Sequence, residues 1–332
     1  MKKIEFYDTT LRDGEQAPGN AISPEDKLRI AIELEKIGMH TIEAGFPISC
    51  EEDFRAVKMI SSGIKSAVIS AFARCLEKDI DCAHEATKEA KNKMISIFYA
   101  VSDIHLEKKY NISREGALVK IRESIQYTKK FFSNIKFGLE DATRADPVFL
   151  YQVIDLLLEE GVNSIVIADT TGWIIPSETF NLVKGIMDRV AGRAKVSMHC
   201  HNDLGMATAN TLSAIVAGVD EVETTINGIG ERAGNTSFEE VATALVVRKD
   251  FFQRDMQIRI KNISDLSDLV YSILGRTASF EKPVVGINAF RHEAGIHING
   301  MKKDPTTYEI LNPELIGRKR EFVVGRHSGK NK

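Results

Sequence analysis

The sequence has few cysteines, one tryptophan and no long hydrophobic run. Its four cysteines contain no CxxC pair: Cys50, Cys75, Cys82 and Cys200. This excludes a disulfide framework and favours a reducing compartment. No apolar run reaches the roughly 18 residues of a membrane span, and the N-terminal MKKIEFYDTT lacks the apolar segment of a signal peptide. We therefore expect a cytoplasmic protein with no membrane partner.

An excess of charge of one sign is also absent. Lys and Arg number 44 and Asp and Glu number 47, which gives a formal net charge of −3. This balance argues against a nucleic-acid partner bound through bulk positive charge. Hydrophobic residues make up 43% and charged residues 27% of the 332 residues, as in ordinary globular proteins. A chain of this length can bury a large core without disulfides.

One pattern fills the first 250 residues: a short, nearly continuous apolar run followed by an amphipathic stretch. Such runs are typical of strands that are buried on both faces. The eight predicted strands are Ile4–Thr9, Thr41–Phe46, Ala67–Ala73, Met94–Ser102, Ile135–Glu140, Ser164–Thr170, Lys195–Asn202 and Glu221–Asn227. The predicted helices between them include Pro24–Ile37, Arg114–Phe131, Pro147–Glu160, Pro176–Val190 and Ala207–Ala217.

Eight such units in about 250 residues predict an α/β fold, a (β/α)8 TIM barrel. The alternative is an open doubly wound sheet, which calls for a glycine-rich GxGxxG turn after the first strand. The segment Asp8–Gly14 reads DTTLRDG and does not match. We expect the catalytic barrel to cover residues 1–250. Residues 251–332 are predicted to form linker helices and a small helical and loop-rich subdomain.

Polar residues gather where the predicted strands end, which is the active-site face of such barrels. His199-Cys-His201 is the sharpest signal, because residues i and i+2 of a strand share a face. With Asp13 after the first strand, the two imidazoles suit one divalent ion, Mg²⁺, Mn²⁺, Zn²⁺ or Co²⁺. The alternative is a pair of ordinary polar strand residues.

Three further features at these ends have two interpretations each. Arg12 either stabilises developing oxyanion charge or closes a salt bridge at the barrel mouth. Glu140 either acts on a substrate or pairs with Arg144. The glycine-rich segment Asn227–Asn235 either approaches a ligand with its backbone or is a tight turn. It contains no GK[ST] and is therefore unlike a P-loop.

Four motifs together resemble the DRE-TIM metallolyase superfamily, in particular its branch of acyl-CoA:2-oxo acid condensing enzymes. This branch contains the 2-isopropylmalate, homocitrate and citramalate synthases. The motifs are DTTLRDGEQ at 8–16, IEAGFP at 42–47, HCHNDLG at 199–205 and NGIGERAGN at 227–235. They occur in order over essentially the whole chain, each at a predicted strand end.

The resemblance implies a metal-dependent Claisen condensation, with acetyl-CoA as co-substrate. Its implied metal ligands are Asp13, His199 and His201, with Asn235 as a weaker neighbour. Catalytic roles fall to Arg12, Glu140, His297 and Tyr308. The 2-oxo acid would meet Arg12, Glu43, Glu140 and Thr170, and CoA would meet Asn227, Gly228, Gly230, Glu231 and Arg232.

The resemblance also implies a homodimer. In this family a His and a Tyr of the appended subdomain reach into the partner's barrel, and His297 and Tyr308 match them. Without the family, His297 reads as a loop histidine. Because the sequence ends at Lys332, we expect it to lack the C-terminal regulatory domain that 2-isopropylmalate synthases commonly carry. Two alternatives to a condensing enzyme therefore remain. One is a truncated, non-catalytic binding subunit, and the other is a lyase that catalyses the reverse cleavage.

Two 2-oxo acids remain as the main substrate candidates. Segments 73–81 and 308–317 favour 3-methyl-2-oxobutanoate and hence 2-isopropylmalate, a step of leucine biosynthesis. Segments 138–146 and 207–211 resemble homocitrate synthases, which use 2-oxoglutarate, and Ser96 and Ala168 depart from the isopropylmalate pattern. A second carboxylate needs a cation near it. Arg74, which could also pair with a carboxylate, and Lys136, expected inside the barrel, are the candidates.

Overall fold

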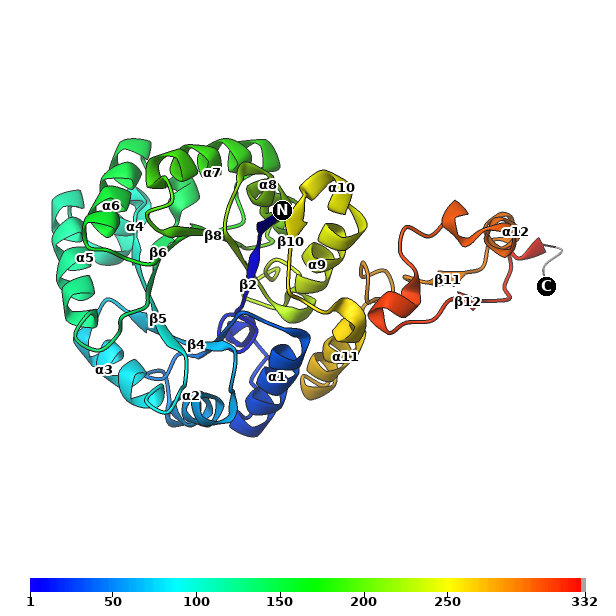
Figure 1. Ribbon diagram of the computed structural model, residues 1–332, viewed down its shortest axis with the longest axis horizontal. Coiled ribbons are helices and arrows are strands. Elements are labelled where there is room, and N and C mark those ends of the chain that lie inside the picture. Colours follow the sequence, from blue (N-terminus) through cyan, green and yellow to red (C-terminus); the bar gives the residue numbers. More distant parts are fainter. Residues whose placement is uncertain (330–332) are drawn as a thin grey trace.

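The computed structural model describes residues 1–329 and contains a closed barrel of eight parallel strands (Figure 1). Its strands follow the chain order from β2 to β9 around the barrel. Their bounds are β2 Glu5–Asp8, β3 Thr41–Gly45, β4 Val68–Arg74, β5 Lys93–Ala100, β6 Ile135–Glu140, β7 Ser164–Asp169, β8 Lys195–Cys200 and β9 Glu221–Thr224. All eight predicted strands are present, and the TIM-barrel fold class is confirmed.

Helices surround the barrel and cover the outer face of the strands (Figure 1). They are α1 Pro24–Ile37, α2 Glu51–Gly63, α3 Glu77–Ala86, α4 Asp103–His105, α5 Arg114–Thr128, α6 Pro147–Glu159, α7 Pro176–Val190, α8 Ala207–Ala217, α9 Phe238–Val247, α10 Lys249–Phe252 and α11 Ile263–Ile273. Helix α1 shows why the local sequence sets these bounds. Ser23 accepts a hydrogen bond from Asp26 N at its start, and Gly38 ends it at φ 91°, a backbone conformation that glycine adopts without strain.

Several predicted strands are too long at their carboxyl ends. The run expected to reach Asn227 ends at Thr224, because Ile226–Gly228 forms a turn with Asn227 at φ 65°. The backbone N–H of Asn227 is bound by the Glu239 carboxylate. The run expected to reach Asn202 ends at Cys200, and His201 after it forms only an isolated bridge with Asn235. The polar residues after each strand therefore belong to loops over the barrel mouth.

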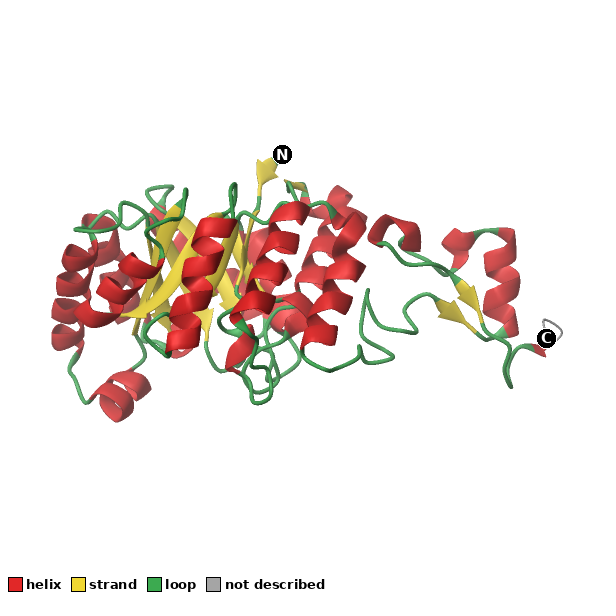
Figure 2. Ribbon diagram, turned by 90° about the horizontal axis from the view of Figure 1, so that it is seen from below, coloured by secondary structure: helices red, strands yellow, loops and turns green. Residues whose placement is uncertain are grey.

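The C-terminal part of the chain forms an arm beside the barrel. Helix α11 still packs against α1, and its Ile263, Leu266 and Val270 join the buried core. Beyond it, β11 (Arg291–His292) pairs with β12 (Glu321–Phe322), and α12 spans Gly295–Lys303. Figures 1 and 2 show this arm projecting away from the barrel. Within residues 1–329, no helix is long and apolar enough to cross a membrane.

A buried acid beneath the barrel mouth gives the fold a pH dependence. Asp8 at the end of β2 is fully buried, and Thr10 donates to it from its backbone N–H and its hydroxyl. Burial raises the pKa of Asp8 to about 7, although the Thr10 hydrogen bonds oppose this shift. Because the unfolded chain ionises this acid near pH 4, the contribution of Asp8 to the free energy of unfolding falls as the pH rises from 4 to 7.

We therefore expect Asp8→Asn to become more stable relative to the wild type as the pH rises over that interval. The relative gain in free energy of unfolding should approach about 4 kcal/mol and stay constant above pH 7. Urea unfolding of both proteins at pH 4, 5.5, 7 and 8 measures it. A stability difference that does not change with pH would contradict the buried, protonated Asp8.

Candidate active site

A cavity of about 350 Å³ opens at the carboxyl ends of the barrel strands. Larger hollows lie around His40 at the opposite end and beside α11, but the predicted site residues converge on this one. Those lining it are Arg12, Asp13, Glu140, Thr170, His199, His201, Glu231 and Arg232. The sequence motifs thus meet at one place, although their residues lie more than 200 positions apart along the chain.

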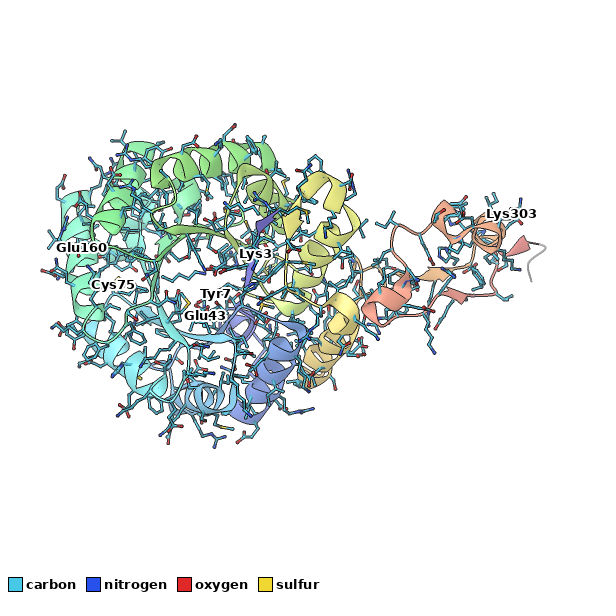
Figure 3. All side chains as sticks on the ribbon, in the orientation of Figure 1. Lys3, Tyr7, Glu43, Cys75, Glu160 and Lys303 are labelled. Carbon is cyan, nitrogen blue, oxygen red and sulfur yellow. The ribbon has the colours of Figure 1, made fainter. Side chains whose placement is uncertain are left out.

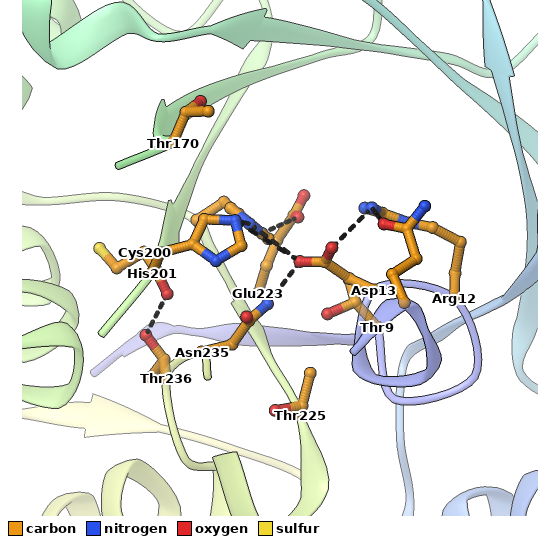
Figure 4. Close-up of polar contacts among 12 residues, drawn as sticks. Thr9, Arg12, Asp13, Thr170, Cys200, His201, Glu223, Thr225, Asn235 and Thr236 are labelled. Atoms are coloured by element: carbon orange, nitrogen blue, oxygen red, sulfur yellow. Dashed lines mark hydrogen bonds and ion pairs between the residues drawn. The ribbon is translucent and has the colours of Figure 1, made fainter. Parts of the chain in front are cut away.

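Asp13, His199 and His201 form a buried cluster that can hold one metal ion. Asp13 Oδ2 lies 3.3 Å from His199 Nε2 and 3.8 Å from His201 Nε2, and the two Nε2 atoms are 3.3 Å apart. Ligands about 2.1 Å from a shared ion lie roughly 3 to 3.5 Å from one another. One carboxylate and two imidazoles therefore fit a divalent ion and leave further positions open for a substrate. Figure 4 shows Asp13 and His201 in this cluster.

Electrostatics favour the metal-binding protonation states of Asp13 and His201, whereas His199 would have to release a proton to bind an ion. Burial would raise the pKa of Asp13, but Arg12 and the two histidines hold it well below its ordinary value. For His201, burial and the neighbouring charge of His199 both lower the pKa, to about 4. Burial opposes the charged form of His199, yet its hydrogen bonds to Asp13 and Glu223 raise its pKa to about 9. Asp13 is thus ionised and His201 neutral at pH 7.

Asn235 contacts the same carboxylate through its side-chain amide. Its Nδ2 donates to Asp13 Oδ2 at 2.5 Å, while Asn235 Oδ1 is buried without a hydrogen-bond partner in the described chain. An amide offers a donor and an acceptor of nearly the same shape, so the side chain can also turn its oxygen towards an ion. Gly230 is required beside it, because a Cβ there would lie 2.0 Å from Asn235 Oδ1.

Arg12 is held rigidly at the cavity wall. Its Nε donates to Glu43 Oε2 at 2.6 Å, and its Nη1 donates to Asp13 Oδ1 at 3.0 Å. The guanidinium also lies 4.0 Å from the centre of the Phe72 ring. The predicted salt bridge of Arg12 is therefore confirmed, and because Arg12 also lines the cavity, its proposed action on oxyanion charge stays a prediction.

Glu43 lies behind Arg12 instead of lining the cavity. Its side chain is buried and accepts a hydrogen bond from the Tyr7 hydroxyl at 2.8 Å. Figure 3 shows Tyr7 and Glu43 inside the ring of strands. The structure thus gives Glu43 the task of orienting Arg12.

Glu140 does not pair with Arg144. Its Oε1 accepts from Lys109 Nζ at 2.6 Å, whereas Arg144 pairs with Asp141. Glu140 Oε2 is buried and has no hydrogen-bond partner in the part of the chain described. His105 Nδ1 lies 3.6 Å from this oxygen. The alternative interpretation of Glu140 as an Arg144 partner is therefore wrong, because Glu140 ends β6 whereas Arg144 lies in the turn that follows it and binds Asp141 there.

The loop after β9 divides into an anchored part and an open part. Asn227 is buried, and its side chain bonds Ser267 on α11. Glu231 and Arg232 instead line the cavity, where Arg232 pairs with Asp203 at 2.7 Å and donates to the Thr170 carbonyl. Only the second half of the loop therefore faces the space where a ligand would bind.

His297 and Tyr308 come together on the arm. Their rings stack with centroids 4.1 Å apart, and both side chains are exposed. Because the arm projects from the barrel (Figure 1), they do not reach the cavity of their own chain. The structure thus pairs these two predicted residues and separates them from the others.

Glu223 belongs to the site and was missed from the sequence. Its Oε2 lies 2.9 Å from His199 Nδ1, and Figure 4 shows Glu223 together with Asp13 and His201. The available signal was the pair Glu221 and Glu223, two acids at alternate positions of the last predicted strand and so on one face of it. Such charges inside a barrel need partners.

Three comparisons with known proteins agree with this geometry. A model described as HMGL-like matches residues 3–270, and one described as a homocitrate synthase post-HMGL domain matches residues 284–332. Curated 2-isopropylmalate synthases of Bacillus licheniformis and Listeria innocua are each 46% identical over the whole chain. The chain spans 64% and 65% of the length of these two relatives. The resemblance noted from the motifs is therefore confirmed.

A likeness to solved structures supports the fold. The hydroxymethylglutaryl-CoA lyase of Pseudomonas aeruginosa matches with a TM-score of 0.71 at 20% identity, covering 83% of this chain and 94% of that one. At this level of identity, the likeness shows only that the two chains share a fold.

Proposed function

Because this chain belongs to the HMGL-like family, within the DRE-TIM superfamily, we propose that it condenses acetyl-CoA with a 2-oxo acid. We place 3-methyl-2-oxobutanoate first, which would yield 2-isopropylmalate and CoA in leucine biosynthesis. The observation that carries this proposal is the cluster of Asp13, His199 and His201 beside Arg12 in one cavity. The 46% identity to 2-isopropylmalate synthases supports the choice of reaction.

The divalent ion would be held by Asp13, His199 and His201, with Asn235 beside them. When bound, it would supply Lewis-acid polarisation of the ketone. The acetyl methyl group loses a proton, and its carbon then forms the new bond to the keto carbon. The keto oxygen gains negative charge in that step, and the fixed guanidinium of Arg12 stabilises it. Water then cleaves the thioester and releases CoA.

The remaining roles fall to groups that line the cavity. Glu140 and Thr170 would orient the 2-oxo acid, while Glu231 and Arg232 would face CoA. The base for the methyl proton would be His297 of a neighbouring subunit, assisted by Tyr308. A histidine suits this role because its ordinary pKa lies near neutrality.

Four unpaired cysteines support a cytoplasmic location.

The cavity wall favours an uncharged side chain on the substrate. The aromatic rings of Phe72 and Phe98 stack with centroids 4.8 Å apart, and Val166 and Ala168 complete the wall. The cations within reach are already paired. Arg74 binds Asp79 through two nitrogens, and Lys109 binds Glu140. A second substrate carboxylate would have to share a cation with one of these carboxylates.

A thiol-release assay with acetyl-CoA and a panel of 2-oxo acids tests this function. We expect kcat/KM for 3-methyl-2-oxobutanoate to exceed that for 2-oxoglutarate by at least about tenfold, the cost of leaving a charge poorly paired. Arg74→Ala should leave the reaction of the branched substrate nearly unchanged. The reverse order would favour the homocitrate reaction. Release of no CoA with any acid would instead favour a non-catalytic subunit.

A homodimer with exchanged arms is the second part of the proposal. Its support is the projecting arm that carries the exposed pair His297 and Tyr308. Mixing Arg12→Ala and His297→Ala chains should then restore activity, because one site of each hybrid dimer keeps both residues. Random exchange predicts about a quarter of the wild-type specific activity. If subunits exchange, as checked by mass spectrometry, and no activity returns, the arm acts within its own chain.

A further inference from the structure

A buried lysine inside the barrel is the feature that the proposed reaction leaves unexplained. Lys136 on β6 is fully buried, and its Nζ lies 3.3 Å from the centre of the Tyr7 ring. Nζ also contacts Glu223 Oε1 at 2.7 Å and bonds Glu221. The lysine points inwards as predicted, but two carboxylates already neutralise it, and it does not line the cavity. It therefore cannot serve a second substrate carboxylate.

Burying three charged side chains is costly, and barrel interiors are ordinarily filled with branched apolar residues. The contacts of Glu223 indicate what this group does. One oxygen of its carboxylate binds Lys136, and the other lies 2.9 Å from His199 Nδ1. On the far side of the same imidazole, His199 Nε2 faces Asp13 and His201, each at 3.3 Å.

The contacts from Lys136 to Glu223 and from Glu223 to His199 set the orientation of the His199 imidazole. An imidazole that donates its Nδ1–H to a carboxylate keeps the lone pair of Nε2 for a metal ion. Glu223 can fix the rotation and the tautomer of His199 only if its own carboxylate is held. Lys136 holds it, since it binds the oxygen that His199 does not use.

We propose that Glu223, anchored by Lys136, is a positioning residue that aims His199 Nε2 into the candidate metal site. This inference rests on the metal binding proposed above. It gives a role to Lys136, which takes no part in the proposed reaction or in substrate binding.

The chain offers a matched control two residues away. Glu221 and Glu223 lie on the same strand, are both buried and both contact Lys136 Nζ. Glu223 alone of the two contacts His199. A glutamine at 223 has one acceptor and one donor end, so it cannot accept from both Lys136 and His199. A glutamine at 221 can keep its carbonyl on Lys136.

The test is a titration of the metal-free full chain with Co²⁺, followed by visible absorption and by calorimetry. We expect Glu223→Gln to raise the dissociation constant about 10- to 100-fold and to change the spectrum of bound Co²⁺. Glu221→Gln should stay within about threefold of the wild type. Lys136→Met should weaken binding by at least about tenfold, because Glu223 loses its anchor. Circular dichroism establishes that each variant is folded.

The outcomes separate this inference from the function on which it rests. Wild-type protein that binds no Co²⁺ would contradict the proposed metal site itself. Wild-type binding that is unchanged in folded Glu223→Gln, or weakened equally in Glu221→Gln, would overturn the positioning role. If Glu223→Gln does not fold, Lys136→Met carries the test, and unchanged affinity in that folded variant overturns the inference.

Discussion

Replacing His201 with alanine is expected to abolish stable metal binding and with it nearly all turnover. His201 is one of three groups whose ligand atoms converge at the barrel mouth, and a catalytic site of this type uses about three protein ligands. Loss of an outer hydrogen bond costs such sites about 10- to 100-fold in affinity, so loss of a direct ligand should cost more than about 100-fold. Metal content after dialysis and kcat of the variant measure both effects.

The same substitution should leave the fold nearly intact. At pH 7 His201 is neutral, since its pKa lies near 4, and its Nδ1 has no hydrogen-bond partner among residues 1–329. Its removal therefore breaks no ion pair, and the contact that it loses, with His199 Nε2 at 3.3 Å, leaves that nitrogen beside Asp13 Oδ2. His327→Ala, at an exposed histidine of the arm, is the control and should bind metal normally. Full metal occupancy and unchanged turnover in His201→Ala would contradict the assignment.

Arg12→Ala is expected to lower kcat by a factor of about 10² to 10³, which is typical for removal of one fixed donor to a developing oxyanion. Arg12 is fixed before the substrate arrives by Glu43, Asp13 and the Phe72 ring. Arg12→Lys should recover little, because a single ammonium cannot bind Glu43 and Asp13 in the planar arrangement of the guanidinium. Steady-state kinetics of both variants, with kcat and KM resolved, measure this.

Loss of Arg12 also leaves two buried carboxylates without their cation. We expect a drop in the free energy of unfolding of about 3 to 5 kcal/mol, the usual cost of breaking a buried pair. Urea unfolding therefore accompanies the kinetics, and rates are compared at a temperature where every variant is folded. Turnover within about tenfold of the wild type in folded Arg12→Ala would remove the oxyanion role and leave Arg12 as a structural cation.

The sequence alone determined the order of strands and helices and the identity of the candidate metal ligands. These features depend on local patterns. Apolar runs of strand length, the start of α1 at Ser23 and its end at Gly38 are all encoded within a few residues. His199 and His201 share a face because the strand repeats every two residues. The four motifs likewise placed Arg12 and Asp13 at a strand end.

The tertiary structure decided which of these side chains remain free to act. Lys136 meets Glu221 and Glu223 across the barrel, 85 and 87 positions away along the chain, and this pairing removes it from the substrate. Glu140 meets Lys109 instead of its close neighbour Arg144. Such pairs depend on strand register and on the closure of the barrel, which bring distant residues together. A sequence pattern does not show which distant residues come into contact. The ion-pair partners of Lys136 and Glu140 therefore became visible only in the folded structure.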